Sequence, residues 1–128
     1  MEDAYSVKLS KIIDAFKLET FYLPDLPENI LVTCARVNRP GLQMVGFYDH
    51  YESARIQIIG KVEYLYLHTL TKEERHARLD DFFRTKPVGV IYTTSLEVSD
   101  DAVDLAEKYG VPLMRTSKSS SDFMAGLI

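Results

Sequence analysis

The sequence has one cysteine, no tryptophan and no long apolar run. Cys34 cannot form a disulfide within the chain, and because it follows the apolar segment 30–33 we expect a buried thiol in a strand. No apolar stretch approaches the roughly 20 residues that cross a membrane. Residues 1–4 lack the basic and then apolar layout of a signal peptide. These absences predict a soluble, cytoplasmic protein.

Basic residues are not in excess either. The chain carries 15 Lys and Arg against 19 Asp and Glu, a net charge of −4, and the charges fall in short clusters. A nucleic-acid backbone needs a basic face, which this pattern does not supply. The 128 residues suit one domain with one core, without repeats or low-complexity runs. We therefore expect a single domain over 1–128 that binds neither nucleic acid nor membrane.

Recognisable catalytic and metal-binding motifs are missing as well. The three histidines show no metal-ligand spacing: His50, His68 and His76. No G-x-S-x-G nucleophile elbow occurs. The polar run 49–52 could hold acid–base groups, although a solvated loop explains it equally simply. The aspartate pairs at 80–81 and 100–101 lie on predicted helices, where a solvated face or a dipole partner accounts for them. The sequence predicts no metal site and no catalytic set.

A Gly-Lys pair at 60–61 resembles the centre of a nucleotide-binding phosphate loop. That loop has the pattern G-x-x-x-x-G-K-[ST], in which the glycines free backbone N–H groups for phosphate and the hydroxyl holds Mg²⁺. Here Arg55 stands at the first glycine and Val62 at the hydroxyl position. The pattern therefore predicts a strand over 55–59 that ends at Gly60, with no nucleotide chemistry in this chain.

The first half of the chain predicts one helix and several short strands. Apolar residues at three- and four-residue steps favour a helix over 7–17, capped by Ser6. The predicted strands cover residues 21–23, 30–34, 42–47 and 55–59, the third of them ending in a loop. Between them, the segment 38–41 is the strongest turn, in which Pro40 presets one φ and Gly41 takes a positive one.

The second half predicts alternating helices and strands. Residues 61–70 fit a helix or a strand, and we prefer the helix. Thr71 and Glu74 form a capping box before a helix over 72–84 that buries Leu79, Phe82 and Phe83. The apolar run 88–92 is typical of a central parallel strand. A helix follows Ser99 and ends at Gly110, then a strand over 111–114 and a last helix from 119. This order predicts an α/β fold with a mixed, largely parallel sheet flanked by helices.

The last predicted helix ends on Leu127 and Ile128 without a polar tail. A natural terminus usually frays into polar residues. We therefore expect more protein to follow in the parent sequence.

Two places stand out as ligand-binding candidates: the loop 38–41, and the strand ends at 93–95 and 115–117. Ligands of open α/β sheets bind beyond the carboxyl ends of strands, and hydroxyls with an arginine suit an anion. Alternatively, the hydroxyls cap helices and Arg115 pairs with a neighbour. We expect Arg39 to be exposed, so that its removal leaves the fold intact. The candidate ligand or partner contacts are Asn38, Arg39, Gly41, Arg55, Thr93, Thr94, Arg115 and Thr116.

Four segments together resemble the N-terminal domain of bacterial HPr kinase/phosphorylase: YSVKL at 5–9, VNRPGLQMVGFYD at 37–49, RIQIIGKVE at 55–63 and YGVPLMRT at 109–116. The resemblance runs from about residue 5 to the end of the chain. Members of this family phosphorylate a serine of the phosphocarrier HPr, remove that phosphate by phosphorolysis, and link carbon supply to catabolite repression. Their chemistry belongs to a C-terminal kinase domain with a true phosphate loop.

The resemblance implies a non-catalytic assembly or regulatory domain. ATP and Mg²⁺ would act in the absent catalytic domain, and this chain itself would hold no cofactor. Its partners would be the C-terminal kinase domain of the same polypeptide and, through the parent enzyme, HPr. Family enzymes form hexamers. Without the catalytic domain we expect a monomer–dimer mixture. Weak self-association would use the surface around residues 47–66, which is rich in tyrosine: Tyr48, Tyr51, Tyr64 and Tyr66. The alternative interpretation is that these tyrosines pack in the core.

The family's N-terminal domain is also similar in fold to the uridine-binding N-terminal domain of Mur ligases. In those ligases a Ser-Arg segment helps to hold the nucleotide, and Asn38-Arg39 stands at the matching position, with Asn in place of Ser. The alternative function is therefore a small-molecule module that senses a nucleotide or phosphosugar at Arg39 or Arg115.

Overall fold

Three strands with apolar residues on both faces form the centre of the molecule. In the computed structural model, which describes residues 5–127, these strands are β5 (Ile56–Ile59), β6 (Val90–Tyr92) and β7 (Leu113–Arg115). Every residue of β5 and β6 is buried. Strands covered on both faces are continuous apolar runs because neither face meets water. The uninterrupted apolar stretches of the sequence therefore belong between two layers of helices.

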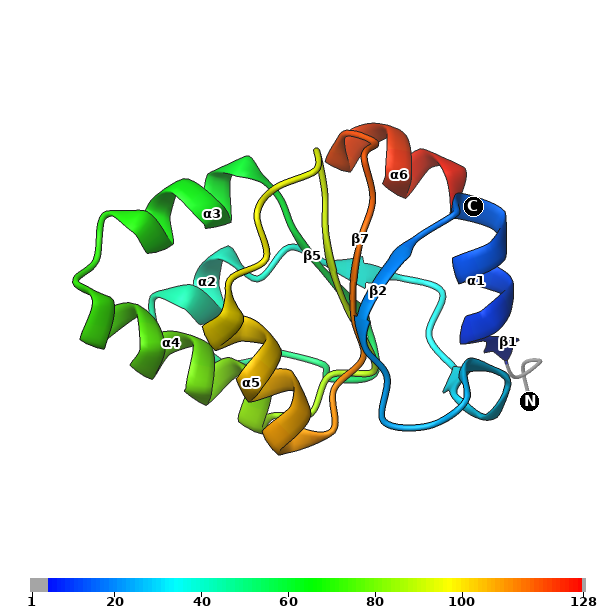
Figure 1. Ribbon diagram of the computed structural model, residues 1–128, viewed down its shortest axis with the longest axis horizontal. Helices are drawn as coiled ribbons and strands as arrows, with labels where there is room; N and C mark the ends of the chain where they lie inside the picture. The colour runs from blue at the N-terminus through cyan, green and yellow to red at the C-terminus, as the bar shows by residue number, and fades with distance from the viewer. Residues whose placement is uncertain (1–4, 128) are drawn as a thin grey trace.

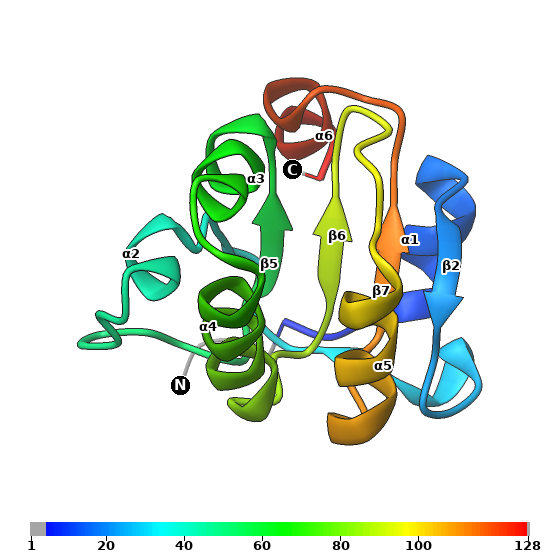
Figure 2. The same cartoon turned by 60° about the vertical axis from the view of Figure 1, so that its left-hand side comes forward.

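These strands lie in a five-stranded sheet with the order β2-β7-β6-β5-β4. The outer strands are β2 (Glu19–Tyr22) and β4 (Val37–Asn38). Strands β4 to β7 are parallel, and β2 runs antiparallel to β7 (Figure 2). A separate antiparallel pair joins β1 (Val7–Lys8) to β3 (Leu31–Val32). The predicted mixed, largely parallel sheet is confirmed.

Helices cover both faces of the sheet (Figure 1). One face carries α2 (Gly41–Met44), α3 (Lys61–His68), α4 (Lys72–Arg84) and α5 (Asp100–Tyr109). The other face carries α1 (Leu9–Phe16) and α6 (Ser120–Gly126), and a short 3-10 helix, η1 (Pro27–Asn29), follows β2. Side chains alternate along each strand, so that Ile58 and Ile91 pack with α1 and α6, whereas Ile59 and Tyr92 pack with α2 to α5.

Several predicted elements are confirmed. Helix α4 has the predicted bounds and buries its three predicted apolar residues. Its capping box is formed, because Thr71 Oγ1 accepts from the Glu74 N–H at 3.1 Å and Glu74 Oε1 accepts from the Thr71 N–H at 3.0 Å. The ambiguous segment 61–70 contains helix α3. Ser99 caps α5, Ser119 caps α6, and β6 is the central strand.

The predicted strand over 42–47 is wrong. Residues 41–44 form helix α2, and the neighbouring strand is β4, which begins four residues before it. The apolar pattern misleads because only Met44 of its large apolar residues enters the core, whereas Leu42 and Val45 are exposed. The expected positive φ falls on Gly46 at 94°, not on Gly41. Pro40 still lies in a turn, which leads into α2, and only the positive φ occurs later in the chain than predicted.

Smaller corrections concern the ends of elements. Helix α1 begins at Leu9, because residues 7–8 pair with β3, and Ser6 is not its cap. The predicted strand 30–34 shortens to β3, so that Cys34 lies outside any strand and is half-buried. β2 begins before the predicted strand 21–23. Ile128, predicted in the last helix, lies outside the described residues.

Gly110 ends α5 in the left-handed region with φ 69°. We expect Gly110→Ala to lower the free energy of unfolding by about 1–2 kcal/mol, because a Cβ disfavours this conformation. Crowding would not contribute, since the nearest atom to that Cβ is 3.9 Å away. Chemical denaturation of both proteins measures the difference.

The matched control is Gly41→Ala, because Gly41 has no positive φ and a Cβ there has nothing within 4 Å. Its effect should be neutral or slightly stabilising. Equal losses in the two variants would contradict the conformational explanation.

Candidate functional site

The loops that follow the parallel strands meet at one edge of the sheet (Figure 2). They surround a hollow of about 230 Å³ at the carboxyl ends of the strands. Its lining includes two cationic side chains and four hydroxyls, which are typical of an anion site. The lining residues are Arg39, Lys61, Val62, Thr94, Ser119, Ser120 and Ser121.

An ion pair lies against this hollow. Arg39 Nη2 donates to Glu63 Oε1 at 2.9 Å, and the Glu63 side chain is only 4% exposed. The same oxygen accepts from the Gly60 N–H at 2.8 Å. Glu63 therefore satisfies one of the free N–H groups at the start of α3 and lies where a carboxylate favours the helix dipole. The carboxylate of Glu63 therefore lies beside the start of α3, where it would repel a phosphate.

A side chain at Gly60 would force Ser120 and Arg39 to move. A Cβ there would lie 2.5 Å from Ser120 Oγ and 2.6 Å from Arg39 Nη2. Its φ of −105° is ordinary for any residue. The glycine of the Gly-Lys pair thus permits the close approach of Arg39 and α6 to the end of β5, and does not build a phosphate-binding turn.

The loop after β6 is held against the loop after β7. Thr94 and Ser95 both have left-handed φ values, 56° and 51°. The Thr94 N–H donates to Lys118 O at 2.8 Å, and the Ser95 N–H donates to Thr116 O at 3.0 Å. Non-glycine residues in this region cost energy and persist only where the surroundings impose them. The two loops therefore form one rigid rim of the hollow.

Some predicted site residues come together at this edge. Arg39 and Thr94 line the hollow. Thr93 is fully buried behind it, with its Oγ1 2.7 Å from Ser120 Oγ. Thr116 is buried and its Oγ1 accepts from the Lys118 N–H at 3.2 Å. These hydroxyls hold the rim, and only Arg39 and Thr94 of the predicted set face the hollow.

Asn38 and Gly41, two of the predicted site residues, do not line the hollow. Asn38 Nδ2 donates to Gln57 Oε1 at 2.6 Å and to Gln43 Oε1 at 3.0 Å. This amide network ties the end of β4 to β5 and α2, and so fixes the start of the Arg39 side chain. Gly41 begins α2 and has open space around it.

Arg115 and Arg55 do not join the hollow. Arg115 Nε and Nη2 donate to the two carboxylate oxygens of Glu19 at 2.9 and 3.0 Å, and Nη1 donates to Leu96 O at 3.0 Å. Its guanidinium also lies 5.1 Å from the Phe21 ring centroid. Arg55 precedes β5, so it lies at the opposite edge of the sheet, where it pairs with Glu52 at 2.5 Å. The alternative prediction, that Arg115 pairs with a neighbouring residue, is therefore confirmed.

Lys61, Glu63 and the serines at 119–121 belong to this site, although they are not among the residues predicted from the sequence. A usable signal existed for Glu63, because Gly60 at the N-cap and Glu at N3 have the same spacing as the capping box at 71–74. No sequence signal links the serines of α6 to Arg39, since only the fold brings them together.

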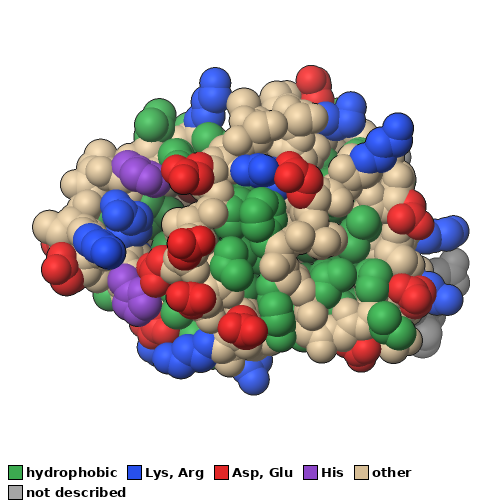
Figure 3. Space-filling view, viewed as in Figure 1, with side chains coloured by type: hydrophobic (Ala, Val, Ile, Leu, Met, Phe, Trp, Pro, Cys, Tyr) green, Lys and Arg blue, Asp and Glu red, His purple; other side chains and the backbone are tan. Residues whose placement is uncertain are grey.

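The face shown in Figure 3 has a predominantly acidic middle. Asp and Glu side chains gather over and beside α5, whereas most Lys and Arg side chains lie toward the rim of this face (Figure 3). Within residues 5–127 no group of three or more His, Cys, Asp or Glu could hold a metal ion. No helix in the same range has the length and apolar character that crossing a membrane requires.

Comparison with known proteins gives consistent relatives. Residues 7–128 match the family described as HPr Serine kinase N terminus. The chain is 36% identical over 125 residues to the HPr kinase/phosphorylase of Lachnoclostridium phytofermentans and 33% identical over 123 residues to that of Streptococcus uberis. These alignments cover 97% and 96% of this chain but 40% and 39% of the relatives. The chain thus spans about two fifths of the length of the curated relatives that it matches.

A solved structure has a similar fold. It contains the CBS and DRTGG domains of the regulatory region of Clostridium perfringens pyrophosphatase, complexed with the activator diadenosine tetraphosphate. The TM-score is 0.67 over 94% of this chain and 45% of that chain, with 18% sequence identity. At this identity the likeness concerns the fold alone.

Replacement of Arg39 tests the ion pair at the hollow. Contrary to the expectation of a freely exposed arginine, Arg39 is the charge partner of a buried carboxylate. We expect Arg39→Ala to lower the free energy of unfolding by about 1–3 kcal/mol, because it leaves Glu63 with one neutral donor. Arg36→Ala is the control, since Arg36 is exposed and lies just before β4, whereas Arg39 lies just after it. A double-mutant cycle with Glu63→Gln measures the coupling, and additive effects would show that no pair exists.

A second prediction concerns the pH dependence of the Glu19–Arg115 pair. The hydrogen bonds from Arg115 lower the pKa of Glu19 in the folded state. The pair therefore stabilises the fold above the usual glutamate pKa of about 4.3, and this contribution is lost as the pH falls through the lower folded value. We expect Glu19→Gln to lower the melting temperature near neutral pH, with the difference from the unmodified chain vanishing in acid. Glu28→Gln, at an exposed site, should show no such trend; a pH-independent gap would exclude the charge-based explanation.

Proposed function

The chain belongs to the family of HPr serine kinase N-terminal domains, and from this membership we propose that it is the non-catalytic assembly and regulatory domain of a bifunctional HPr kinase/phosphorylase. The parent enzyme would phosphorylate a serine of HPr, remove the phosphate by phosphorolysis and thereby control carbon catabolite repression in the cytoplasm. ATP, Mg²⁺ and the contact with HPr would belong to the C-terminal kinase domain of the same polypeptide.

The observation that carries this proposal is the closed start of α3. Where a kinase would cradle a phosphate after its strand, this chain places the carboxylate of Glu63, 2.8 Å from the Gly60 N–H. A phosphate there would meet a buried negative charge. The Gly-Lys pair is therefore unsuited to nucleotide chemistry, which supports the proposal that this chemistry belongs to a separate kinase domain.

Self-association is part of the proposed assembly role. Five large apolar side chains are exposed in this part of the chain. Phe47, Val62 and Leu65 belong to the segment 47–66, and Leu42 and Val45 lie just before it in the sequence. Exposed apolar groups that gather in one region favour protein contacts. The tyrosines of this segment are half-buried, and Tyr51, Tyr64 and Tyr66 pack against the core. The apolar side chains, more than the tyrosines, would form the contact in a weak dimer, which sedimentation equilibrium of the chain detects.

A second candidate function is small-molecule sensing at the hollow of the carboxyl edge. It is favoured by Arg39 and Lys61 beside four hydroxyls, and by an Arg39 Nε that is buried without a partner among the described residues. Titration calorimetry with uridine nucleotides and glycolytic phosphates tests it. Binding that disappears in Lys61→Gln would favour sensing, and the absence of heat with every ligand would exclude this candidate.

The main proposal predicts two results with HPr. The chain alone, with ATP and Mg²⁺, should leave HPr unphosphorylated. A chimera in which this chain replaces the matching segment of the Lachnoclostridium phytofermentans relative should phosphorylate HPr, and should differ from that relative's catalytic part alone in assembly or in the ratio of kinase to phosphorolysis activity.

Labelled ATP and sedimentation velocity measure these outcomes. Stoichiometric phosphoserine on HPr with the chain alone would contradict the non-catalytic role. A chimera that matches the isolated catalytic part in assembly and in both activities would contradict the regulatory role.

A further inference from the structure

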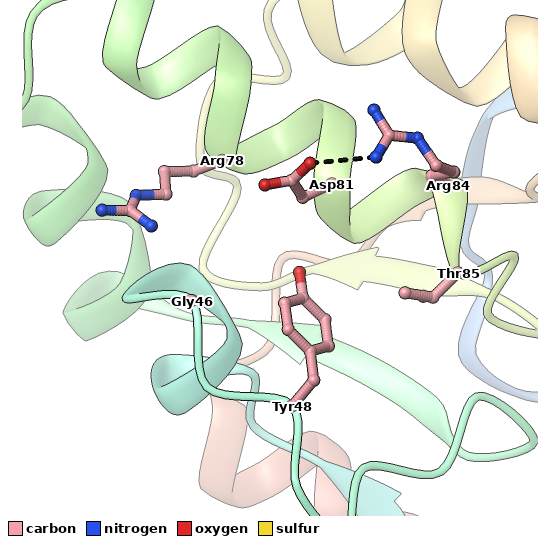
Figure 4. Close-up of a pocket in the computed structure, with 6 residues that line it drawn as sticks. All are labelled: Gly46, Tyr48, Arg78, Asp81, Arg84 and Thr85. Atoms are coloured by element: carbon pink, nitrogen blue, oxygen red, sulfur yellow. Dashed lines mark hydrogen bonds and ion pairs between the residues drawn. The ribbon is translucent and has the colours of Figure 1, made fainter.

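A second hollow, of about 480 Å³, lies between α4 and the segment that follows α2. None of its lining residues takes part in the site at the carboxyl edge. Figure 4 shows side chains from α4 on one side and the ring of Tyr48 on the other. The lining residues are Gly46, Tyr48, Arg78, Asp81, Arg84 and Thr85.

Tyr48 brings an unused hydrogen-bond donor to this hollow. Its ring packs edge-on against Tyr51, with centroids 5.4 Å apart, and its hydroxyl points toward α4 (Figure 4). The hydroxyl is buried and has no hydrogen-bond partner among the described residues. Burial raises the pKa of Tyr48 to about 12, so the group is a neutral donor at physiological pH. Buried polar groups without a partner are rare because they are costly, and a ligand atom is one explanation.

The two arginines differ in what they already bind. Arg84 donates to Asp81 Oδ1 at 3.1 Å and also pairs with Asp80, so its charge is neutralised within α4. Arg78 makes no side-chain hydrogen bond or ion pair with any residue of the described range. Figure 4 shows its guanidinium on the opposite side of Tyr48 from Arg84. Arg78 is therefore the cation of the hollow that has no direct ion-pair partner, and its charge also acts on Glu74, one helical turn earlier on α4.

Gly46, in the segment after α2, lies next to the Arg78 side chain. Gly46 has φ 94°, and a Cβ there would lie 2.9 Å from Arg78 Nη1. Any other residue would be strained at this φ, and its Cβ would displace the end of the Arg78 side chain. The loop thus keeps Arg78 at the hollow without filling the space in front of it.

The charges of the lining decide which anion fits. Arg78 supplies one positive charge without a direct ion-pair partner, whereas Asp81 faces the hollow with a second carboxylate oxygen for which the described residues show no partner. A phosphate dianion would set a surplus negative charge against Asp81. A carboxylate matches one guanidinium through two parallel hydrogen bonds. The oxygen of Asp81 can then accept from a hydroxyl on the same ligand.

We propose that this hollow binds a small hydroxylated carboxylic acid. Arg78 holds the carboxylate through its guanidinium, the Tyr48 hydroxyl donates a third hydrogen bond to it, and Asp81 accepts from the ligand hydroxyl. The site is independent of the chemistry at the carboxyl edge and of the proposed kinase partner.

The test is an NMR titration of the chain with D-glycerate, following the arginine Nε–Hε signals. Glycerate should shift the Arg78 signal and saturate. Arg78→Gln and Tyr48→Phe should each weaken binding by about tenfold or more, because each removes a hydrogen bond to a charged group. Arg75→Gln, on the same helix but outside the hollow, should bind as the unmodified chain does. Tyr48→Phe removes an unpaired hydroxyl, so its melting temperature should be unchanged or higher, which shows that weaker binding is not a folding defect.

Two comparison anions complete the experiment. Propionate, which lacks the hydroxyl, should bind more weakly than glycerate, and inorganic phosphate should bind more weakly in the unmodified chain than in Asp81→Asn. No saturable shift at Arg78, tighter binding of phosphate than of glycerate in the unmodified chain, or equal affinities in Arg75→Gln and Arg78→Gln would each overturn the proposal.

Discussion

The carboxylate of Glu63 organises the carboxyl edge of the sheet. It is nearly inaccessible to water, and it accepts from the Gly60 N–H and from Arg39. A buried carboxylate is tolerated only when it is paired and hydrogen-bonded. The start of α3, the end of β4 and the absence of a side chain at residue 60 are therefore mutually dependent, because the loss of any one leaves a charge or a donor unsatisfied.

This constraint also limits what the edge can bind. A helix start with free N–H groups after a parallel strand is ordinarily a site for phosphate. Here the carboxylate of Glu63 accepts from the Gly60 N–H and places a negative charge beside the helix start, whereas Arg39, Lys61 and the serines of α6 line the hollow outside it. The fold thus keeps a hollow at the carboxyl edge of the sheet, with a buried carboxylate beside it.

The sequence predicts those parts of the structure that depend on neighbours in the chain. Helix α4, its capping box and the Gly110 end of α5 rest on contacts within a few residues, and each was predicted. The segment 42–47 was not, because its apolar residues do not share a buried face. Arg115 could not be assigned from sequence, since its partner Glu19 lies 96 residues away on an antiparallel edge strand. Local patterns carry no information on which strand becomes that neighbour.

Some arginines of the described range pair with a carboxylate, whereas Arg78 does not. Arg39, Arg84 and Arg115 each pair with a carboxylate. The pairs of Arg39 and Arg115 connect different elements, and that of Arg84 lies within α4. Arg78 faces no carboxylate within pairing distance in the described range, although Asp81 shares its hollow. A guanidinium without a direct ion-pair partner, beside a buried and unpaired hydroxyl, attracts an external anion. The internal ion pairs therefore join the end of β4 to α3 and β2 to β7, and Arg78, which has no such pair, is where we propose that an external carboxylate binds.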